Sequence, residues 1–215
     1  MPWNGERTSR GSNRPVKADK LPSWLELSPV MDVITDESLP LELFILKSHL
    51  VIEVHLYHIL SVRLQIDREH LPPLTFFPLA KLALGGAHAA ILPIVLALND
   101  LRNEFSHELN PTRLDAAFGK FVSKAGYFWP EHDPYDKPAE FASVRDAAIR
   151  AAGGDCVGQV FWLFVDVALT SNAIPAEEAV AAETIVKGIR DVLEITRSVQ
   201  GAVRLTVAEA IARRK

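Results

Sequence analysis

Apolar side chains recur along most of this 215-residue chain with the three- and four-residue spacing of an α-helix. No stretch shows the sustained alternation of a half-buried strand. Proline and glycine divide the apolar runs into segments of helical length. Hydrophobic residues make up 48% of the chain, which is enough for a substantial core at this size. We therefore predict an all-α fold, an antiparallel helical bundle with additional C-terminal helices.

The breaks also predict where the helices begin and end. A long helix starts near Ser38, which can cap it, and continues to about Asp67. Two glycine pairs, 85–86 and 153–154, are interpreted as helix breaks, while Gly188 and Gly201 indicate a kink or close packing in the last helix. The remaining helices are predicted at residues 24–33, 76–84, 89–109, 111–124, 138–152, 156–170 and 175–213.

Four regions follow from this pattern. Residues 1–20 carry five Lys or Arg against two acids without apolar periodicity, so they are predicted to be a disordered tail. Residues 21–125 form the predicted bundle, and residues 126–138 a proline-rich loop. The C-terminal helices, residues 139–215, are expected to pack on the bundle. A formal charge of −4 argues against coating nucleic acid by bulk electrostatics but leaves room for a local basic site.

Polar residues lie at the C-terminal end of the apolar helix predicted at 89–109. At about 100° per residue, Arg102 falls in the centre of its apolar stripe. A guanidinium keeps its proton, so inside a core it needs an anion. Glu53 is the one charge on an apparent buried seam of the preceding long helix, and we predict that it pairs with Arg102. Such a pair can fix helix register or serve a functional site, and the sequence leaves both open. That apparent seam consists of Leu46, Leu50, Glu53, Tyr57, Leu60 and Leu64.

An arginine, a polar residue, three further positions and a histidine, as in Arg102, Asn103 and His107, resemble the signature of HEPN domains. These are all-helical modules found in toxin ribonucleases and antiviral effectors. The resemblance covers roughly residues 38–125. It implies that two copies of the motif meet in a homodimer and cleave RNA without a metal. Relatives of the mannitol operon repressor share the helical plan without an assigned ribonuclease role.

The resemblance implies roles for individual residues. Arg102 would stabilise phosphate charge, His107 would move protons, and Asn103 would orient a phosphate or the imidazole. On one straight helix Arg102 and His107 point about 140° apart, so a twofold dimer is needed to bring such groups together. Glu53 would position the arginine. The polar residues that flank the motif are Asn99 and Ser106.

Other functional classes find less support in the sequence. His49, Glu53, His55 and His58 cannot all face one ion on a helix, so we predict no metal and no cofactor. The single cysteine, Cys156, lacks an obvious base and is interpreted as a small buried hydrophobe, which suits a reducing cytoplasm. We expect no membrane partner. The main hypothesis is an RNA-directed module of a stress or defence system, with an antitoxin or regulatory protein as partner; the alternative is a non-catalytic regulatory or interaction protein.

Overall fold

The structure, a computed structural model, describes Val30, Asp36 and residues 38–107, 111–130, 138–171, 173–174 and 176–212. Within these ranges all regular secondary structure is α-helix or 3-10 helix and no strand occurs, which confirms the predicted all-α class. The predicted tail 1–20 and all of the predicted helix 24–33 except Val30 lie outside the described residues. The elements are α2 (Leu41–Leu64), η2 (Arg68–His70), α3 (Phe76–Leu84), η3 (Gly86–His88), α4 (Leu92–His107), α5 (Pro111–Lys124), α6 (Pro138–Thr170) and α7 (Ala176–Ala212).

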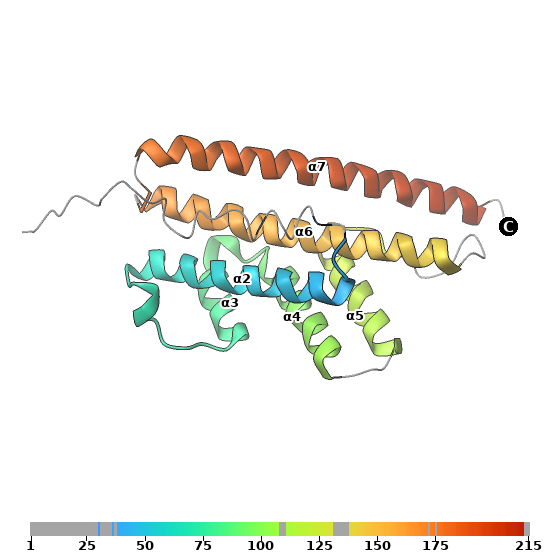
Figure 1. The fold of residues 1–215 in the computed structure, drawn as a ribbon, viewed down its shortest axis with the longest axis horizontal. Coiled ribbons are helices and arrows are strands. Elements are labelled where there is room, and N and C mark those ends of the chain that lie inside the picture. The colour runs from blue at the N-terminus through green and yellow to red at the C-terminus, as the bar shows by residue number, and fades with distance from the viewer. Residues whose placement is uncertain are drawn as a thin grey trace, which may run out of the picture.

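The helices form three layers with α6 in the middle (Figure 1). On one side of α6 lie α2, α3, α4 and α5, and on the other side α7 runs along its length. The main packing partners are α2 with α6, α4 with α5, and α6 with α7. Because α6 is covered on both faces, its central stretch is almost entirely buried and holds much of the apolar core.

Helix α6 is continuous, so the predicted break at the second glycine pair is wrong. Gly153 lies inside this helix, and an added Cβ there would stand 2.5 Å from Cε1 of Phe44 on α2. A small residue is therefore needed where α2 and α6 come close together. Gly188 and Gly201 likewise lie within the uninterrupted helix α7. In contrast, the first pair does end a helix: Gly85 caps α3, and Gly86 has a φ of +77°.

The buried face of α2 also differs from the predicted seam. Leu46, Leu50 and Leu64 are exposed, and Leu50 leaves 51% of its surface accessible. The face that packs on the core lies about 120° further round the helix. Apolar residues surround nearly the whole of α2, so periodicity alone could not choose the packed side. The buried residues of α2 are Phe44, Ile45, Ser48, His49, Ile52, His55, Leu56, Ile59 and Leu60.

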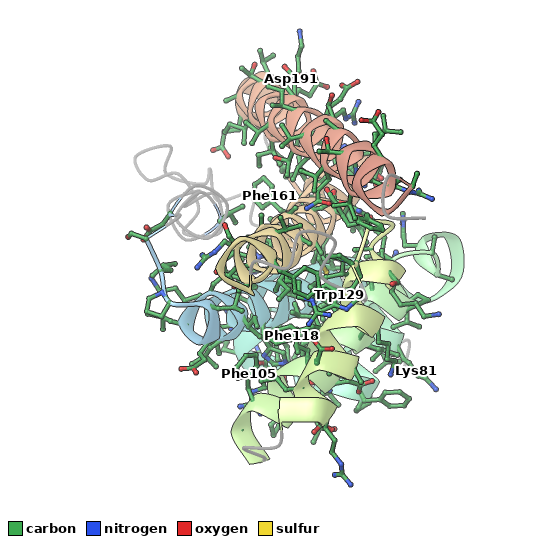
Figure 2. All side chains as sticks on the ribbon, turned by 90° about the vertical axis from the view of Figure 1, so that its right-hand side faces the viewer. Lys81, Phe105, Phe118, Trp129, Phe161 and Asp191 are labelled. Atoms are coloured by element: carbon green, nitrogen blue, oxygen red, sulfur yellow. The ribbon has the colours of Figure 1, made fainter. Side chains whose placement is uncertain are left out.

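A row of aromatic side chains fixes the end of α4 against α5 (Figure 2). The ring of Phe105 lies 5.4 Å from that of Phe118, and Phe118 lies 6.1 Å from Trp129. The guanidinium of Arg145 on α6 covers Trp129 at 4.7 Å and donates to the carbonyl of Pro130. Rings in these edge and offset arrangements pack favourably. They hold α4 in a fixed orientation, with Arg102 one turn before Phe105.

Candidate functional site at the α2–α4 interface

Polar side chains from α2 and α4 meet beside the core. Nε2 of His49 on α2 lies 3.1 Å from Oδ1 of Asn99 on α4. Nδ1 of the same ring lies 3.9 Å from a carboxylate oxygen of Glu53, one helical turn on. Asn99 and Arg102 are three positions apart on α4 and so share one side of that helix. We call His49, Glu53, Asn99, Arg102 and Asn103 the α2–α4 polar cluster.

His49 is the most buried member, with 5% of its surface exposed. Its ring stacks on Phe76 of α3 at 4.3 Å. Burial lowers the pKa of His49 below 6.5; the hydrogen bond to Asn99 and the charge of Glu53 oppose that shift, while the charge of Arg102 adds to it. The ring is therefore neutral at pH 7. It donates Nε2–H to the Asn99 oxygen, and Nδ1, an acceptor, has no hydrogen-bond partner.

Arg102 is half-buried, as its place in the apolar stripe predicts, but the predicted ion pair with Glu53 is not formed. Nη1 of Arg102 donates instead to Oδ1 of Asn103 at 3.2 Å, and its buried Nε has no partner. Glu53 lies nearer His49 and keeps 34% of its side chain exposed. The reason is the rotated packing of α2, which puts Glu53 at the edge of the interface rather than at its centre. The cluster thus holds a guanidinium with an unused donor, and among the described residues no ion pair joins this guanidinium to a carboxylate.

The rest of the predicted motif is only partly defined. Ser106 is exposed and donates to the carbonyl of Arg102 at 3.0 Å, a bond within α4 that leaves its oxygen able to accept. Asn103 accepts from Arg102 and is half-buried. His107 is the last residue of α4, and its side chain lies outside the described residues. The structure therefore brings Asn99 against His49 of α2, places Arg102 and Asn103 about one turn further along α4, and does not define where the imidazole of His107 lies.

His49 was not among the predicted site residues, although the sequence held a signal for it. It stands one helical turn before Glu53, a spacing at which the two side chains are neighbours. A second missed feature is Asp155, which is 1% exposed within α6. It accepts from Arg197 Nη2 of α7 at 2.5 Å and from Gln159 Nε2 at 3.0 Å. Asp155 is a lone charged residue inside an apolar run, and Arg102 shows the same pattern in the sequence.

Cys156 is fully buried, and burial raises the pKa of its thiol far above the ordinary value, with the charge of Asp155 adding to the effect. A thiol that stays protonated is a poor nucleophile. This confirms the interpretation of Cys156 as a small buried hydrophobe. It contributes to the core of α6 rather than to a reactive site.

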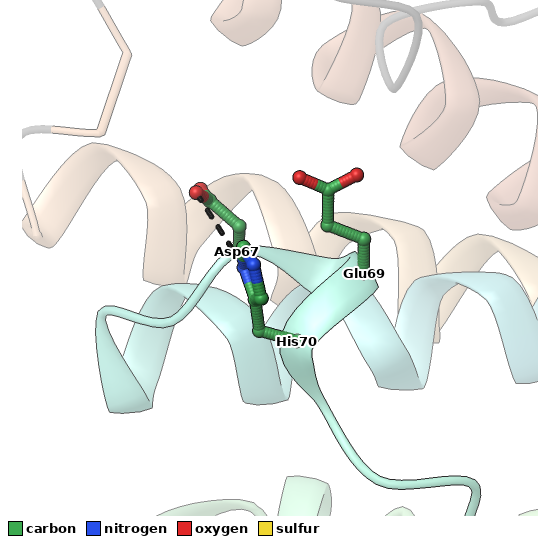
Figure 3. Close-up of side chains that lie close together, drawn as sticks. All are labelled: Asp67, Glu69 and His70. Carbon is green, nitrogen blue, oxygen red and sulfur yellow. Dashed lines mark ion pairs between the residues drawn. The ribbon is translucent and has the colours of Figure 1, made fainter.

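Three possible metal ligands, Asp67, Glu69 and His70, come together on the surface around η2 (Figure 3). Their ligand atoms lie within 4.8 Å of one another, and Nδ1 of His70 is 4.0 Å from Asp67. All three side chains are exposed on one short turn. Exposed acidic groups of this kind are common without an ion, so we assign no metal to them.

Within the part of the chain that the structure describes, two helices are long and apolar enough by length and composition to cross a membrane: α2, and α6 from Phe141 onward. In the α6 stretch 78% of the window is buried inside the protein, and in α2 50% is buried. Core helices of soluble proteins pass the same test, so these two helices are weak evidence for a membrane location.

Comparison with known proteins gives no match to a family model, a curated protein or a solved structure.

Proposed function

We propose that the chain is a homodimeric, HEPN-like helical protein that binds RNA at the α2–α4 polar cluster and cleaves it without a metal. One observation carries the proposal: Arg102 is half-buried, its side chain donates a described hydrogen bond only to Asn103 of its own helix, and its buried Nε has no partner. A buried polar group without a partner is uncommon and calls for an explanation. A phosphate oxygen is the acceptor that a guanidinium with free donors fits best.

The proposed chemistry needs a proton carrier and a cation. The ribose 2′-oxygen attacks the neighbouring phosphorus while its proton is removed; the bond from phosphorus to the 5′-oxygen breaks, and that oxygen gains a proton. The products are a 2′,3′-cyclic phosphate and a 5′-hydroxyl. His107 is the proposed proton carrier, and Arg102 stabilises the charge that builds up on the phosphorane-like state. Asn103 orients Arg102 through the observed hydrogen bond.

The supporting residues act on Arg102 from α2 and from its own helix. Asn99 holds His49 in one tautomer, and Glu53 forms no ion pair with Arg102, which leaves the guanidinium free for an anion. Ser106 adds an exposed hydroxyl beside the motif. These residues are positioning residues in the proposal, and none of them needs to reach the reacting phosphorus.

A second copy of the chain completes the proposed site. Four apolar side chains of α2 are exposed to solvent. They lie near the cluster, because Leu46 and Leu50 precede Glu53 by seven and three positions and so share its side of the helix. We call this surface the α2 leucine face: Leu43, Leu46, Leu50 and Val54. Burial of such a face against its twofold copy would bring two clusters next to one another.

Cleavage of labelled RNA in the presence of EDTA tests the proposal. The parent protein should release products that end in a 2′,3′-cyclic phosphate, and both Arg102→Ala and His107→Ala should abolish them. The matched controls are Arg204→Ala and His70→Ala, which change an exposed arginine and an exposed histidine away from the cluster and should leave cleavage intact. RNA that stays whole with the parent protein, in buffers with and without EDTA, would refute the cleavage step.

A second candidate is a non-catalytic helical regulatory or interaction protein in the cytoplasm, with a regulatory or antitoxin-like protein as partner. The α2 leucine face favours it, because exposed apolar residues along one side of a helix suit a protein partner. In that case Arg102→Ala lowers the melting temperature without any change in an RNA signal, and Leu50→Ser disrupts assembly while the monomer stays folded.

A further inference from the structure

A groove lies between α6 and α7, on the opposite side of α6 from α2 and α4 (Figure 1). It has a volume of about 640 Å³ and is lined only by residues of these two helices. Small-molecule sites commonly fall between about 300 and 1,000 Å³ and combine an apolar floor with a few polar groups. The floor here is Gly158, Ile189 and Leu193, and a Cβ on Gly158 would stand 2.6 Å from Cδ1 of Leu193. The glycine therefore lets the two helices pack closely at the base of the groove.

One end of the groove carries a guanidinium held in place. Asp155, deep in α6, accepts the 2.5 Å bond from Nη2 of Arg197, and Arg197 still exposes 55% of its side chain. The buried carboxylate, with the Tyr127 hydroxyl near it, fixes the direction of the arginine, and the exposed part of the guanidinium leaves N–H groups that a ligand can reach. Such a preorganised cation suits a carboxylate ligand, because little side-chain freedom is lost on binding.

A negative charge stands next to this cation without pairing with it. Glu194 lines the same groove three positions before Arg197, so the two side chains are neighbours on α7. Among the described residues no ion pair joins Glu194 to Arg197, which is turned toward Asp155, or to Arg190, which lies over Trp162. Two opposite charges on neighbouring positions of α7 match a ligand that carries a carboxylate and an ammonium on one carbon atom.

An aromatic surface lies at the other end. Trp162 of α6 is 38% exposed and lines the groove, and the guanidinium carbon of Arg190 stands 5.9 Å from its ring centre. That distance is at the outer limit of a cation–π contact, so the indole is only loosely covered. The lining charges, Asp155 and Glu194 against Arg190 and Arg197, sum to zero, which suits a ligand without net charge.

We infer that the α6–α7 groove binds a small aromatic zwitterion of the aromatic amino acid class. Its ring packs on Trp162, its carboxylate accepts from Arg197, and its ammonium donates to Glu194. The floor formed by Ile189 and Leu193 contacts the apolar body of the ligand. This inference stands on residues of α6 and α7 alone and does not depend on RNA binding or cleavage.

Isothermal titration calorimetry with L-phenylalanine tests the inference on the full chain. L-leucine, 3-phenylpropionate and phenethylamine lack the ring, the ammonium and the carboxylate in turn, and each should bind about tenfold or more weakly than phenylalanine. Trp162→Leu and Glu194→Gln should weaken phenylalanine by a similar factor, whereas Arg204→Gln, an exposed change on α7 outside the groove, should not.

Three results would overturn the inference. The first is no heat of binding with phenylalanine at millimolar concentration. The second is leucine binding as tightly as phenylalanine, since the ring would then not be recognised. The third is unchanged phenylalanine binding in both Trp162→Leu and Glu194→Gln with circular dichroism like that of the parent, since the ligand would then bind elsewhere.

Discussion

Replacement of Gly153 by alanine sets helix propensity against packing, and the structure decides the sign. Alanine inside a helix gains about 0.8–1.0 kcal/mol over glycine. The added Cβ would, however, stand 2.5 and 2.7 Å from two ring carbons of Phe44, which is 2% exposed and therefore has little room to move. Overpacking of a core costs about 1–3 kcal/mol, and contacts this short belong at the upper end. We expect a net loss of about 1–2 kcal/mol.

Gly154 provides a matched control one residue further along α6. A Cβ there meets no described atom within 4 Å, so Gly154→Ala should keep the propensity gain and raise stability by up to about 1 kcal/mol. Thermal unfolding followed by circular dichroism measures the melting temperatures of both variants. For a chain of this size 1 kcal/mol corresponds to roughly 2–4 °C, so the two melting temperatures should move in opposite directions. An equal rise for both variants would refute the close approach of α2 to Gly153.

Three further predictions concern stability. Burial, together with the charges of Arg68 and His55, lowers the pKa of His58 from 6.5 to about 4, so the unfolded chain binds the proton first. The free energy of unfolding is therefore highest above pH 6.5 and falls by at most about 3 kcal/mol as the pH is lowered from 6.5 to 4. In urea unfolding, His58→Gln should show a weaker pH dependence over that range than the parent protein. An unchanged pH dependence would contradict the prediction. Arg197→Ala leaves the Asp155 carboxylate buried without its cation and should cost about 3–5 kcal/mol in urea unfolding, much of it recovered when Asp155→Asn is added; no recovery would mean that the two groups are not coupled. Gly188→Ala, at an exposed position of α7 with no described atom near its Cβ, should stabilise by about 0.5–1 kcal/mol in the same assay, and destabilisation would indicate a hidden contact on that face.

Local chemistry was enough to predict several elements. Proline at the start and a break at the end bound α5 at Pro111–Lys124, and the apolar run Phe76–Leu84 ended at a glycine as predicted. The helix that carries Arg102 was also predicted, with Pro93 in its first turn where proline is tolerated. These features depend on residues near one another in the chain, so a single sequence contains the information.

Features that depend on distant residues could not be predicted in the same way. Gly153 resembles a helix break until Phe44, 109 positions earlier, is known to lie against it. The prediction of which side of α2 is buried was wrong because apolar residues surround that helix, and only contact with α6 selects among its faces. The same rotation of α2 explains why Glu53 does not pair with Arg102 and why His49 occupies the interface in its place.

The most direct test of the α2–α4 cluster as an RNA site is the NMR signal of the Arg102 Nε–H, assigned by its loss in Arg102→Lys. The nitrogen is buried and has no partner in the free protein. Titration with 2′-O-methyl RNA, which cannot be cleaved because the attacking hydroxyl is blocked, should shift this signal while the corresponding signal of exposed Arg204 stays in place. An Arg102 signal that does not move at RNA concentrations that saturate the protein, or RNA that does not bind at all, would contradict the account.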